Sequence, residues 1–402
     1  MPIASYRSWV GIAADRSNGQ LTSAISSSAT SLPVTNLSSG TSTLITSAGA
    51  TYSAIIVDGP LTEVVACSGN LTSGSIACAA TANAHSANVY VMFQLTASVG
   101  PTAYLPVEKF NPIDTYAQLY DKTLRGYQVD SIGAVAGVRT SAWDLSGPIF
   151  ADTYGYILGG LFGSEDYTVG TPSTHAFAVM NTGTYQPVAY ALYFYDGVNV
   201  RIFAGGKFTE STISIDPKAL MMHATKYIAR ASGVVATSYT TAFTTILPTT
   251  SWSASTTIGA SSSLVCLTGQ ITFSRLNPDS PVTLQGIQDP YTIWVGQMSV
   301  KGQLDVVKED DAQLSNYFNE SQPILKWAAL TGSGSTQTGI TVQCTKANYE
   351  TAKTDTQTGG FVRETFTFEA IANTTDKTTA GTGYSPAKVT LTNAVASGTT
   401  YV

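Results

Sequence analysis

The chain has 402 residues, more than one small domain usually needs, so two or three domains are expected. Charged residues make up only 11% of it. About 25% is usual, and a monomer with so few surface charges would dissolve poorly. The net charge of −6 argues against a surface that grips nucleic acid, which would be basic, but leaves room for DNA that passes without being held. We therefore expect much of the surface to be buried in an oligomer.

Residues 1–20 are predicted to form a strand or an extended arm. They contain no basic region followed by an apolar stretch, so no signal peptide is expected. Nowhere in the chain is an apolar run long enough to span a bilayer, so no membrane contact is expected.

Residues 21–98 are predicted to form a small inserted all-β module, because short alternating runs are separated by Gly, Asn and Pro turns. Two of the four cysteines, Cys67 and Cys78, lie in it. They either remain free thiols in a reducing cytoplasm or face each other across a hairpin. Cys266 and Cys344 add no metal-binding spacing.

The first main domain is predicted over residues 99–235. Segment Asp152–Phe162 has a rough apolar stripe typical of a helix, with Asp152 as its N-cap, although three glycines weaken it. Segment Asp114–Arg125 is expected to be a loop or a short helix.

The strongest local signal is a hairpin from Pro187 to Phe203. Asp196-Gly197 between two apolar runs predicts a two-residue type I′ turn, in which Tyr195 pairs with Val198. Both faces are apolar, so the hairpin is either the centre of a sandwich or a surface that meets another subunit. We take it as a candidate assembly hairpin with ten residues: Tyr190, Leu192, Tyr193, Phe194, Tyr195, Val198, Val200, Arg201, Ile202 and Phe203.

Residues 236–372 are predicted to be a diverged repeat of the first main domain. Both halves show a strand, a helix, a hairpin and two closing strands in the same order. The second helix is predicted over Glu309–Phe318, with acidic residues in its first turn, where the helix dipole favours them. The Thr/Ala/Gly-rich residues 373–402 are expected to form an extended tail.

No set of residues predicts catalysis, and no cofactor or metal is expected. His85, His175 and His223 lie far apart in sequence and lack metal-binding spacing. The run Glu309–Asp311 is interpreted as a solvated helix start and not as a cation or acid–base cluster. The chain is therefore predicted to be a structural building block and not an enzyme.

Five motifs occur in a distinctive order: SWVGI at Ser8–Ile12, ADTYGYILGGLFG at Ala151–Gly163, STHAF at Ser173–Phe177, QPVAY at Gln186–Tyr190 and GKFTE at Gly206–Glu210. Together they resemble the major tail tube proteins of long non-contractile-tailed, siphovirus-type bacteriophages, particularly those that infect actinobacteria. The resemblance covers about residues 5–20 and 102–372, and the inserted module departs from it.

The resemblance implies a mainly β fold, with tandem tail-tube β-sandwich/barrel domains that each carry a short flanking helix. It implies rings that stack into a hollow tail tube, through which DNA passes from capsid to host without specific binding. The implied partners are the chain itself, in hexameric or trimeric pseudo-hexameric rings, the tape measure protein, and the tail terminator and tip proteins. The implied location is the virion tail, assembled in the host cytoplasm.

Two other interpretations remain open from the sequence. The chain is another tail or head-completion component of the same fold, or a β-rich carbohydrate-binding or adhesin module, which would be an exported monomer. The inserted module either decorates the tube exterior, ties adjacent rings together or is a passive insertion. An acidic lumen is expected, because it would repel DNA phosphates.

Overall fold

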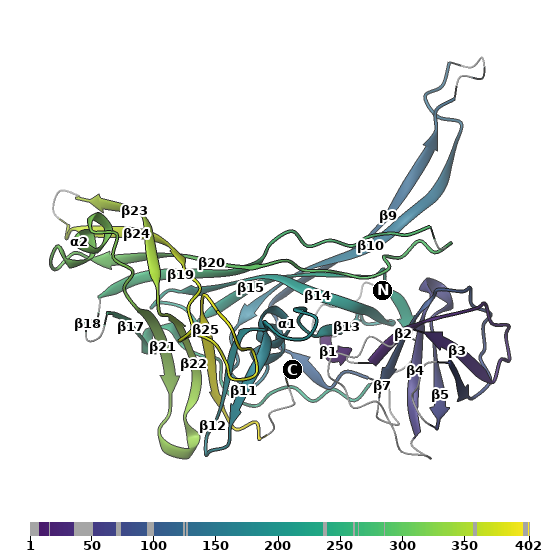
Figure 1. Cartoon of the computed structure of the whole chain (residues 1–402), viewed down its shortest axis with the longest axis horizontal. Coiled ribbons are helices and arrows are strands. Elements are labelled where there is room, and N and C mark those ends of the chain that lie inside the picture. The colour runs from purple at the N-terminus through teal and green to yellow at the C-terminus, as the bar shows by residue number, and fades with distance from the viewer. Residues whose placement is uncertain are drawn as a thin grey trace.

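The computed structural model describes residues 8–15, 17–35, 51–69, 74–94, 100–123, 125, 128–235, 239–259, 262–263, 265–284, 286–356, 360–396 and 401. Over these residues the protein is mainly β, as predicted, with a large sheet, a second sheet and a small closed barrel (Figure 1). Short 3₁₀ helices are η2 (Gly59–Leu61), η3 (Ser251–Ser253) and η4 (Gly334–Thr336).

The large sheet is built around two successive four-stranded units. The first has the order β9 (Lys109–Asp121), β10 (Gly133–Pro148), β15 (Met222–Ala229) and β14 (Val200–Ile215). The second has the order β19 (Cys266–Arg275), β20 (Met298–Val307), β24 (Arg363–Ala370) and β23 (Ala347–Asp355). Strands β14 and β19 join the units, with Thr212 opposite Thr272. One antiparallel ladder therefore runs through both halves of the chain.

The two units repeat each other in detail. A β-bulge falls at residues 208–210 of β14 and at residues 349–351 of β23, which hold the same place in their units. The outer parts of β9 and β10 beyond their irregularity, together with their connection (residues 117–138), are as long as the connection 276–297 between β19 and β20. This order agrees with a tandem duplication. The boundary at 235/236 stays a prediction, because the two halves share their sheets.

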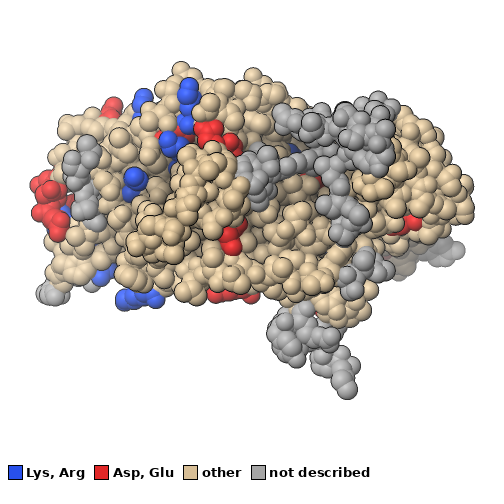
Figure 2. All heavy atoms as spheres, turned by 90° about the horizontal axis from the view of Figure 1, so that it is seen from below, with Lys and Arg blue, Asp and Glu red and all other residues tan. Residues whose placement is uncertain are grey.

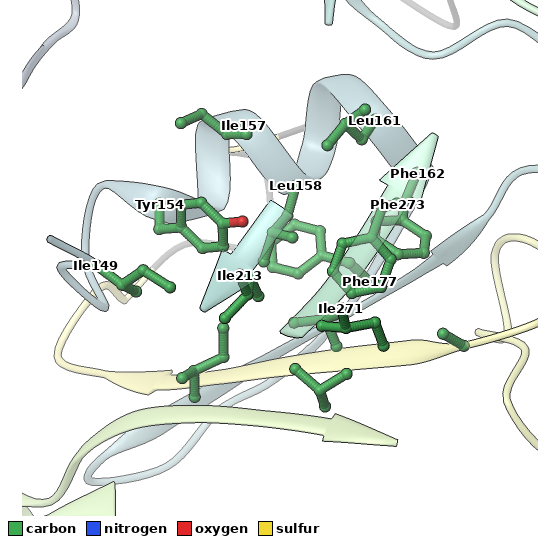
Figure 3. Close-up of a cluster of buried hydrophobic side chains, with 14 of the residues drawn as sticks. Ile149, Tyr154, Ile157, Leu158, Leu161, Phe162, Phe177, Ile213, Ile271 and Phe273 are labelled. Carbon is green, nitrogen blue, oxygen red and sulfur yellow. The ribbon is translucent and has the colours of Figure 1, made fainter. Parts of the chain in front are cut away.

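Helix α1 (Tyr154–Phe162) is buried along its whole length (Figure 3). It packs on β14, β19 and β12 in the main hydrophobic core, where the rings of Phe162 and Phe273 lie 5.2 Å apart. A Cβ at Gly160 would lie 2.4 Å from the Phe208 ring, so this glycine permits the close approach of helix and sheet. The glycines that weaken the isolated helix therefore belong to its packing.

Both helices begin later than predicted. Helix α1 begins at Tyr154, and Asp152, the expected N-cap, lies outside it and accepts a hydrogen bond from the Thr244 hydroxyl. Helix α2 (Ala312–Phe318) begins after the acidic run Glu309–Asp311. The N-cap position of α1 is Thr153, one residue after Asp152. In α2, Asp311 occupies the N-cap position, but its side chain makes no capping hydrogen bond.

The second sheet joins the two halves through the C-terminal segment. Its order is β11 (Gly163–Thr168), β12 (Ser173–Val179), β25 (Lys388–Asn393), β22 (Thr338–Cys344), β21 (Leu325–Thr331), β17 (Ala254–Ile258) and β18 (Ser262–Ser263). The extended tail predicted over 373–402 is wrong for β25, which lies between β12 and β22 and buries Val389 and Leu391. The apolar alternation of β25 is only a few residues long, so the Thr/Ala/Gly-rich composition of the segment 373–402 concealed the strand.

The small barrel is closed by β2 (Ser17–Leu21), β3 (Ser31–Thr35), β6 (Gly74–Cys78), β5 (Glu63–Ser68), β4 (Thr51–Val57) and β7 (Tyr90–Gln94). The predicted all-β character of this module is confirmed. Cys67 and Cys78 lie directly opposite each other on β5 and β6, as free thiols.

The barrel packs against the central hairpin. The hairpin consists of β13 (Ala189–Tyr195) and the first part of β14, and is extended by β1 (Trp9–Asp15), β8 (Ala103–Leu105) and β16 (Gly233–Val235). Ile55 and Met92 of the barrel share one buried cluster with Tyr193 and Ile202 of the hairpin. The barrel therefore covers one apolar face of the hairpin, while the main core covers the other.

The hairpin register differs from the prediction by two residues. Tyr195 lies opposite Val200, not Val198, so the loop has four residues. The carboxylate of Asp196 accepts hydrogen bonds from the N–H groups of Val198 and Asn199, at 2.8 and 2.9 Å, which stabilises the longer loop. A shift of two residues keeps every side chain on its predicted face.

The segment predicted as a loop or short helix, Asp114–Arg125, is instead largely strand β9. It pairs with β10 from Lys109 to Asp121, with an irregularity opposite residues 136–139. Several of its apolar side chains face solvent, so it lacks the clean alternation that identifies a half-buried strand.

Arg275 connects the two halves at the end of α1. This buried side chain of β19 donates hydrogen bonds to the carbonyl oxygens of Leu161 at 2.6 Å, Phe162 at 3.1 Å and Gly296 at 3.2 Å. The C-terminal carbonyls of a helix carry partial negative charge, which favours a cation there. Burial lowers the pKa of Arg275 to about 10, so it stays protonated at neutral pH.

We predict that Arg275→Met lowers the free energy of unfolding by about 3 kcal/mol, because it leaves buried carbonyls without donors. Urea denaturation followed by circular dichroism measures the change. Arg363→Met, at an exposed position on β24, is the matched control and should cost under about 1 kcal/mol. Equal losses for the two variants would contradict the role given to Arg275.

Candidate assembly surfaces

The predicted assembly hairpin lies largely inside the chain. The buried residues among the ten are Tyr190, Leu192, Tyr193, Val200, Ile202 and Phe203. Phe194, Tyr195 and Arg201 are half-buried, and only Val198, in the turn, is exposed, at 62%. The hairpin was interpreted as either the centre of a sandwich or a surface that meets another subunit, and the burial of its strands fits the first. A contact of this hairpin with another subunit stays a prediction, and it would rest on the turn.

A two-stranded arm projects from the molecule (Figure 1). It consists of the outer parts of β9 and β10 and their connection. Its exposed apolar side chains are Tyr116, Leu119, Tyr120, Val129, Ile132, Val135 and Val138, with Leu119 exposed to 61% and Val135 to 67%. Apolar side chains gathered in solvent mark an interaction surface. The prediction from the sequence missed this arm, although its apolar residues stand out in a segment without helical periodicity.

The arm is anchored at its base by ionic contacts. The Arg139 guanidinium donates to both carboxylate oxygens of Asp289 at 2.7 Å, and it lies 3.8 Å from Asp58 of the barrel. Asp58 and Glu63 in turn hold the buried ring of His85, at 3.0 Å from Nδ1 and 2.7 Å from Nε2. The arm, the barrel and the second half of the chain therefore meet at one polar joint.

The connection 276–297 is the counterpart of the arm in the second unit. It also carries exposed apolar side chains, namely Leu276, Val282, Leu284, Tyr291 and Trp294. Asp289, which binds Arg139 of β10, belongs to it, so this connection touches the base of the arm. In each unit of the large sheet, the segment that joins the first strand to the second thus carries exposed apolar side chains.

Each four-stranded unit of the large sheet has one outer strand with a free edge. Among the described residues, β9 pairs only with β10, and β23 pairs only with β24. These edges lie at opposite ends of the sheet (Figure 1). A strand edge with unpaired N–H and C=O groups is a template for a strand of another chain.

The face of the large sheet that points away from the core is polar and rich in hydroxyl groups. The hydroxyls of Thr212 and Thr272 lie 2.9 Å apart across the junction of the two units. Lysines in the middle of this face are paired with carboxylates: Lys226 with Glu210 at 2.9 Å, and Lys301 with Glu350 at 3.0 Å and with Glu369 at 3.2 Å. The pairing leaves these cations less available to an external anion.

The histidines lie apart, as expected from their spacing. His175 is held by Glu165 at 2.6 Å and by the carbonyl oxygen of Val395 at 3.0 Å. Burial lowers the pKa of His223 to about 4. Within the part of the chain that the structure describes, no group of His, Cys, Asp and Glu side chains could hold a metal ion.

Charged side chains are sparse on the surface. Figure 2 shows one face on which Lys, Arg, Asp and Glu form only small scattered groups. None of the helices in the described residues has the length and apolar character needed to cross a membrane.

A family model described as "Phage tail tube protein" matches residues 84–370. The matched region contains both four-stranded units, both helices and strand β7 of the barrel. No curated protein matches the chain.

We predict that the polar joint weakens as the pH rises. Burial by itself lowers the pKa of His85, but hydrogen bonds to Asp58 and Glu63 outweigh burial and raise it. The stability that the charged ring contributes is therefore complete below its unfolded pKa of about 6.5, and is lost as the pH rises through the raised pKa. Thermal unfolding measured across this range should show a falling melting temperature in the natural protein and a flatter profile in His85→Gln. Superimposable profiles would show that His85 is not charged in the folded state.

Proposed function

Because this chain belongs to the phage tail tube protein family and is a structural component of the tail tube of a phage virion, we propose that it polymerises as stacked rings around a channel that conducts DNA. The proposal extends to the tail type. The motif order in Ala151–Gly163 and Gly206–Glu210 supports a long non-contractile tail of siphovirus type, in a phage of actinobacteria.

The observation that carries ring assembly is the repeated sheet. Within one chain, the last strand of the first unit pairs with the first strand of the second, β14 with β19. The corresponding outer strands, β23 and β9, have free edges. Pairing the β23 edge of one subunit with the β9 edge of the next continues the same ladder, and closure into a barrel covers both of these edges.

The duplicated unit favours a trimer over a hexamer. Three chains with two units each place six similar units around one axis, which is a pseudo-hexameric ring. Six chains would place twelve units there and enclose a much wider channel, since barrel diameter grows with strand number. The duplication therefore supports the trimeric form.

The hydroxyl-rich open face of the sheet is proposed to line the channel. It presents paired lysines and neutral hydroxyls, whereas an acidic lumen was expected because it would repel DNA phosphates. Such a surface offers few free cations to DNA phosphates, so DNA can pass without being held.

The arm and the barrel are proposed to act outside the ring-closing ladder. The exposed apolar residues of the arm, such as Leu119 and Val135, are suited to contact an adjacent ring. The barrel is attached to the body through the cluster around Tyr193, and we place it on the exterior of the tube. The tape measure protein inside the tube and the terminator and tip proteins at its ends complete the proposed partners.

Electron microscopy of the purified protein tests this function. We predict rings and tubes with a central channel and three-fold symmetry that mimics six-fold symmetry. A double substitution in the arm, Leu119→Ser with Val135→Ser, should change the melting temperature little and shorten the tubes, because the two residues lie opposite each other on the arm and are 61% and 67% exposed. Leu247→Ser, at an exposed apolar position away from the arm, is the control and should form normal tubes. A dispersed monomer under all conditions would contradict the proposal.

A further inference from the structure

We propose that the contact between neighbouring subunits copies, residue by residue, the register of the junction between β14 and β19. This inference rests on the ring assembly proposed above and specifies which residues meet. In it, β23 of one subunit pairs with β9 of a second copy of the chain.

The bulges align the outer strand β23 with the inner strand β14. Each strand contains one bulge, at residues 208–210 in β14 and 349–351 in β23. After the bulge, β14 resumes its pairing with β15, and β23 resumes its pairing with β24. Superposing the bulges makes Lys353 the equivalent of Thr212.

The ladders carry this alignment across the unit from β14 to β9. Ladder partners in β15 and β24, and then in β10 and β20, lead to Ile113 of β9 as the equivalent of Thr272 of β19. A second feature agrees, because under this alignment the pair Tyr116 and Arg139, where the β9–β10 ladder becomes irregular, is equivalent to the pair Arg275 and Met298, where the β19–β20 ladder ends. The two units therefore have one consistent correspondence.

The correspondence sets the register of the subunit contact. Thr212 lies opposite Thr272 inside the chain, so Lys353 should lie opposite Ile113 of the neighbouring subunit. By the same rule Thr351 should lie opposite Thr115 of the neighbouring subunit. All these side chains belong to the open face of the sheet.

The inward side of this contact is compatible with pairing. Asp114 of β9 would face Ala352, since their equivalents Phe273 and Ser211 face each other. The charge of Asp114 is already neutralised within its own subunit by Arg201 and by the hydroxyl of Ser232 at 2.7 Å. The half-buried Asp114 is therefore already paired within its own subunit when it comes to face the small apolar side chain of Ala352.

Cysteine cross-linking of assembled rings tests the register. We expect Lys353→Cys combined with Ile113→Cys to form covalent dimers and trimers on mild oxidation. The matched control combines Lys353→Cys with Thr115→Cys, which lie on the same face but two residues out of register, and should cross-link at least tenfold less. Each single variant measures the background from the natural cysteines.

A second in-register pair, Thr351→Cys with Thr115→Cys, should also form covalent dimers and trimers on mild oxidation. It tests the register if the first pair of substitutions prevents assembly. Rings that cross-link preferentially through the out-of-register pair would overturn the register and leave ring assembly intact. Absence of rings in the natural protein would instead overturn the proposed function. The two failures are therefore distinguishable.

A separate observation concerns Cys67 and Cys78, and from it we infer that they form a disulfide when the protein meets an oxidant. The two residues are direct partners on β5 and β6. The adjacent pair, Ala66 and Ala79, is hydrogen-bonded, with the Ala79 N–H at 2.7 Å from the Ala66 oxygen. In an antiparallel ladder the next pair is then not hydrogen-bonded, and its Cα atoms lie about 4.5 Å apart, a separation that a disulfide can span.

The two side chains also share one environment. Opposite residues of neighbouring strands point to the same face, and both thiols contact the hydrophobic core of the barrel. Cys67 is buried and Cys78 is half-buried, so Cys78 is the thiol that an oxidant reaches first. Burial raises the pKa of Cys67 to about 12, which slows its reaction at neutral pH.

With oxidised glutathione the reaction balances in two exchanges. The Cys78 thiolate attacks one glutathione sulfur, the glutathione S–S bond breaks, and one glutathione thiolate leaves. The Cys67 thiolate then attacks Cys78 sulfur, and the second glutathione leaves. The two thiol protons pass to the two glutathione thiolates, and the two electrons reduce the oxidised glutathione.

Mass spectrometry of the full chain after treatment with oxidised glutathione tests this inference. We expect the loss of two hydrogen atoms, a peptide that joins Cys67 to Cys78, and a higher melting temperature. Cys67→Ser should instead retain one glutathione on Cys78. Free alkylation of both thiols in the treated natural protein, or a stable glutathione adduct on it, would overturn the inference.

Discussion

The backbone groups of a strand must be paired, and this requirement governs the whole large sheet. The chain meets it internally by joining β14 to β19, and leaves it unmet at β9 and β23. The same ladder that unites the two halves thus ends in two complementary edges. This arrangement makes folding and assembly two stages of one process, and it fits a chain with few surface charges.

The sequence predicted the faces of the central hairpin but not its loop. Faces depend only on the two-residue period of a strand, which survives a shift of two residues. Loop length depends on the Asp196 carboxylate, whose hydrogen bonds to Val198 and Asn199 no pattern reveals. Strand β25 was missed because its partners, β12 and β22, are distant in sequence. The arm was missed because its apolar residues do not alternate cleanly between core and solvent.

Long-range polar contacts account for the remaining differences. Arg275 ends α1 from the opposite half of the chain, and Arg139 ties the arm to Asp289. Neither basic residue stands out in the sequence, since its main partners, Leu161 and Phe162 for Arg275 and Asp289 for Arg139, lie more than a hundred positions away. The candidate hairpin residues were selected because both faces of the hairpin are apolar. Two apolar faces are expected both of a hairpin that contacts another subunit and of a hairpin buried on both sides within its own chain. The structure distinguishes the two, because the barrel covers one face of the hairpin and the main core covers the other.

The barrel leaves and rejoins the body between neighbouring strands. Strand β1 ends just before it and β8 begins just after it, and the two pair antiparallel, with Val10 opposite Leu105. Such a site permits recombination: a different domain can be exchanged here without a change in the strand order of the sheets. The exchange has one condition, because the replacing domain must also shield Tyr193 and Ile202 from water. The apolar surface of the hairpin therefore limits which domains this position can accept.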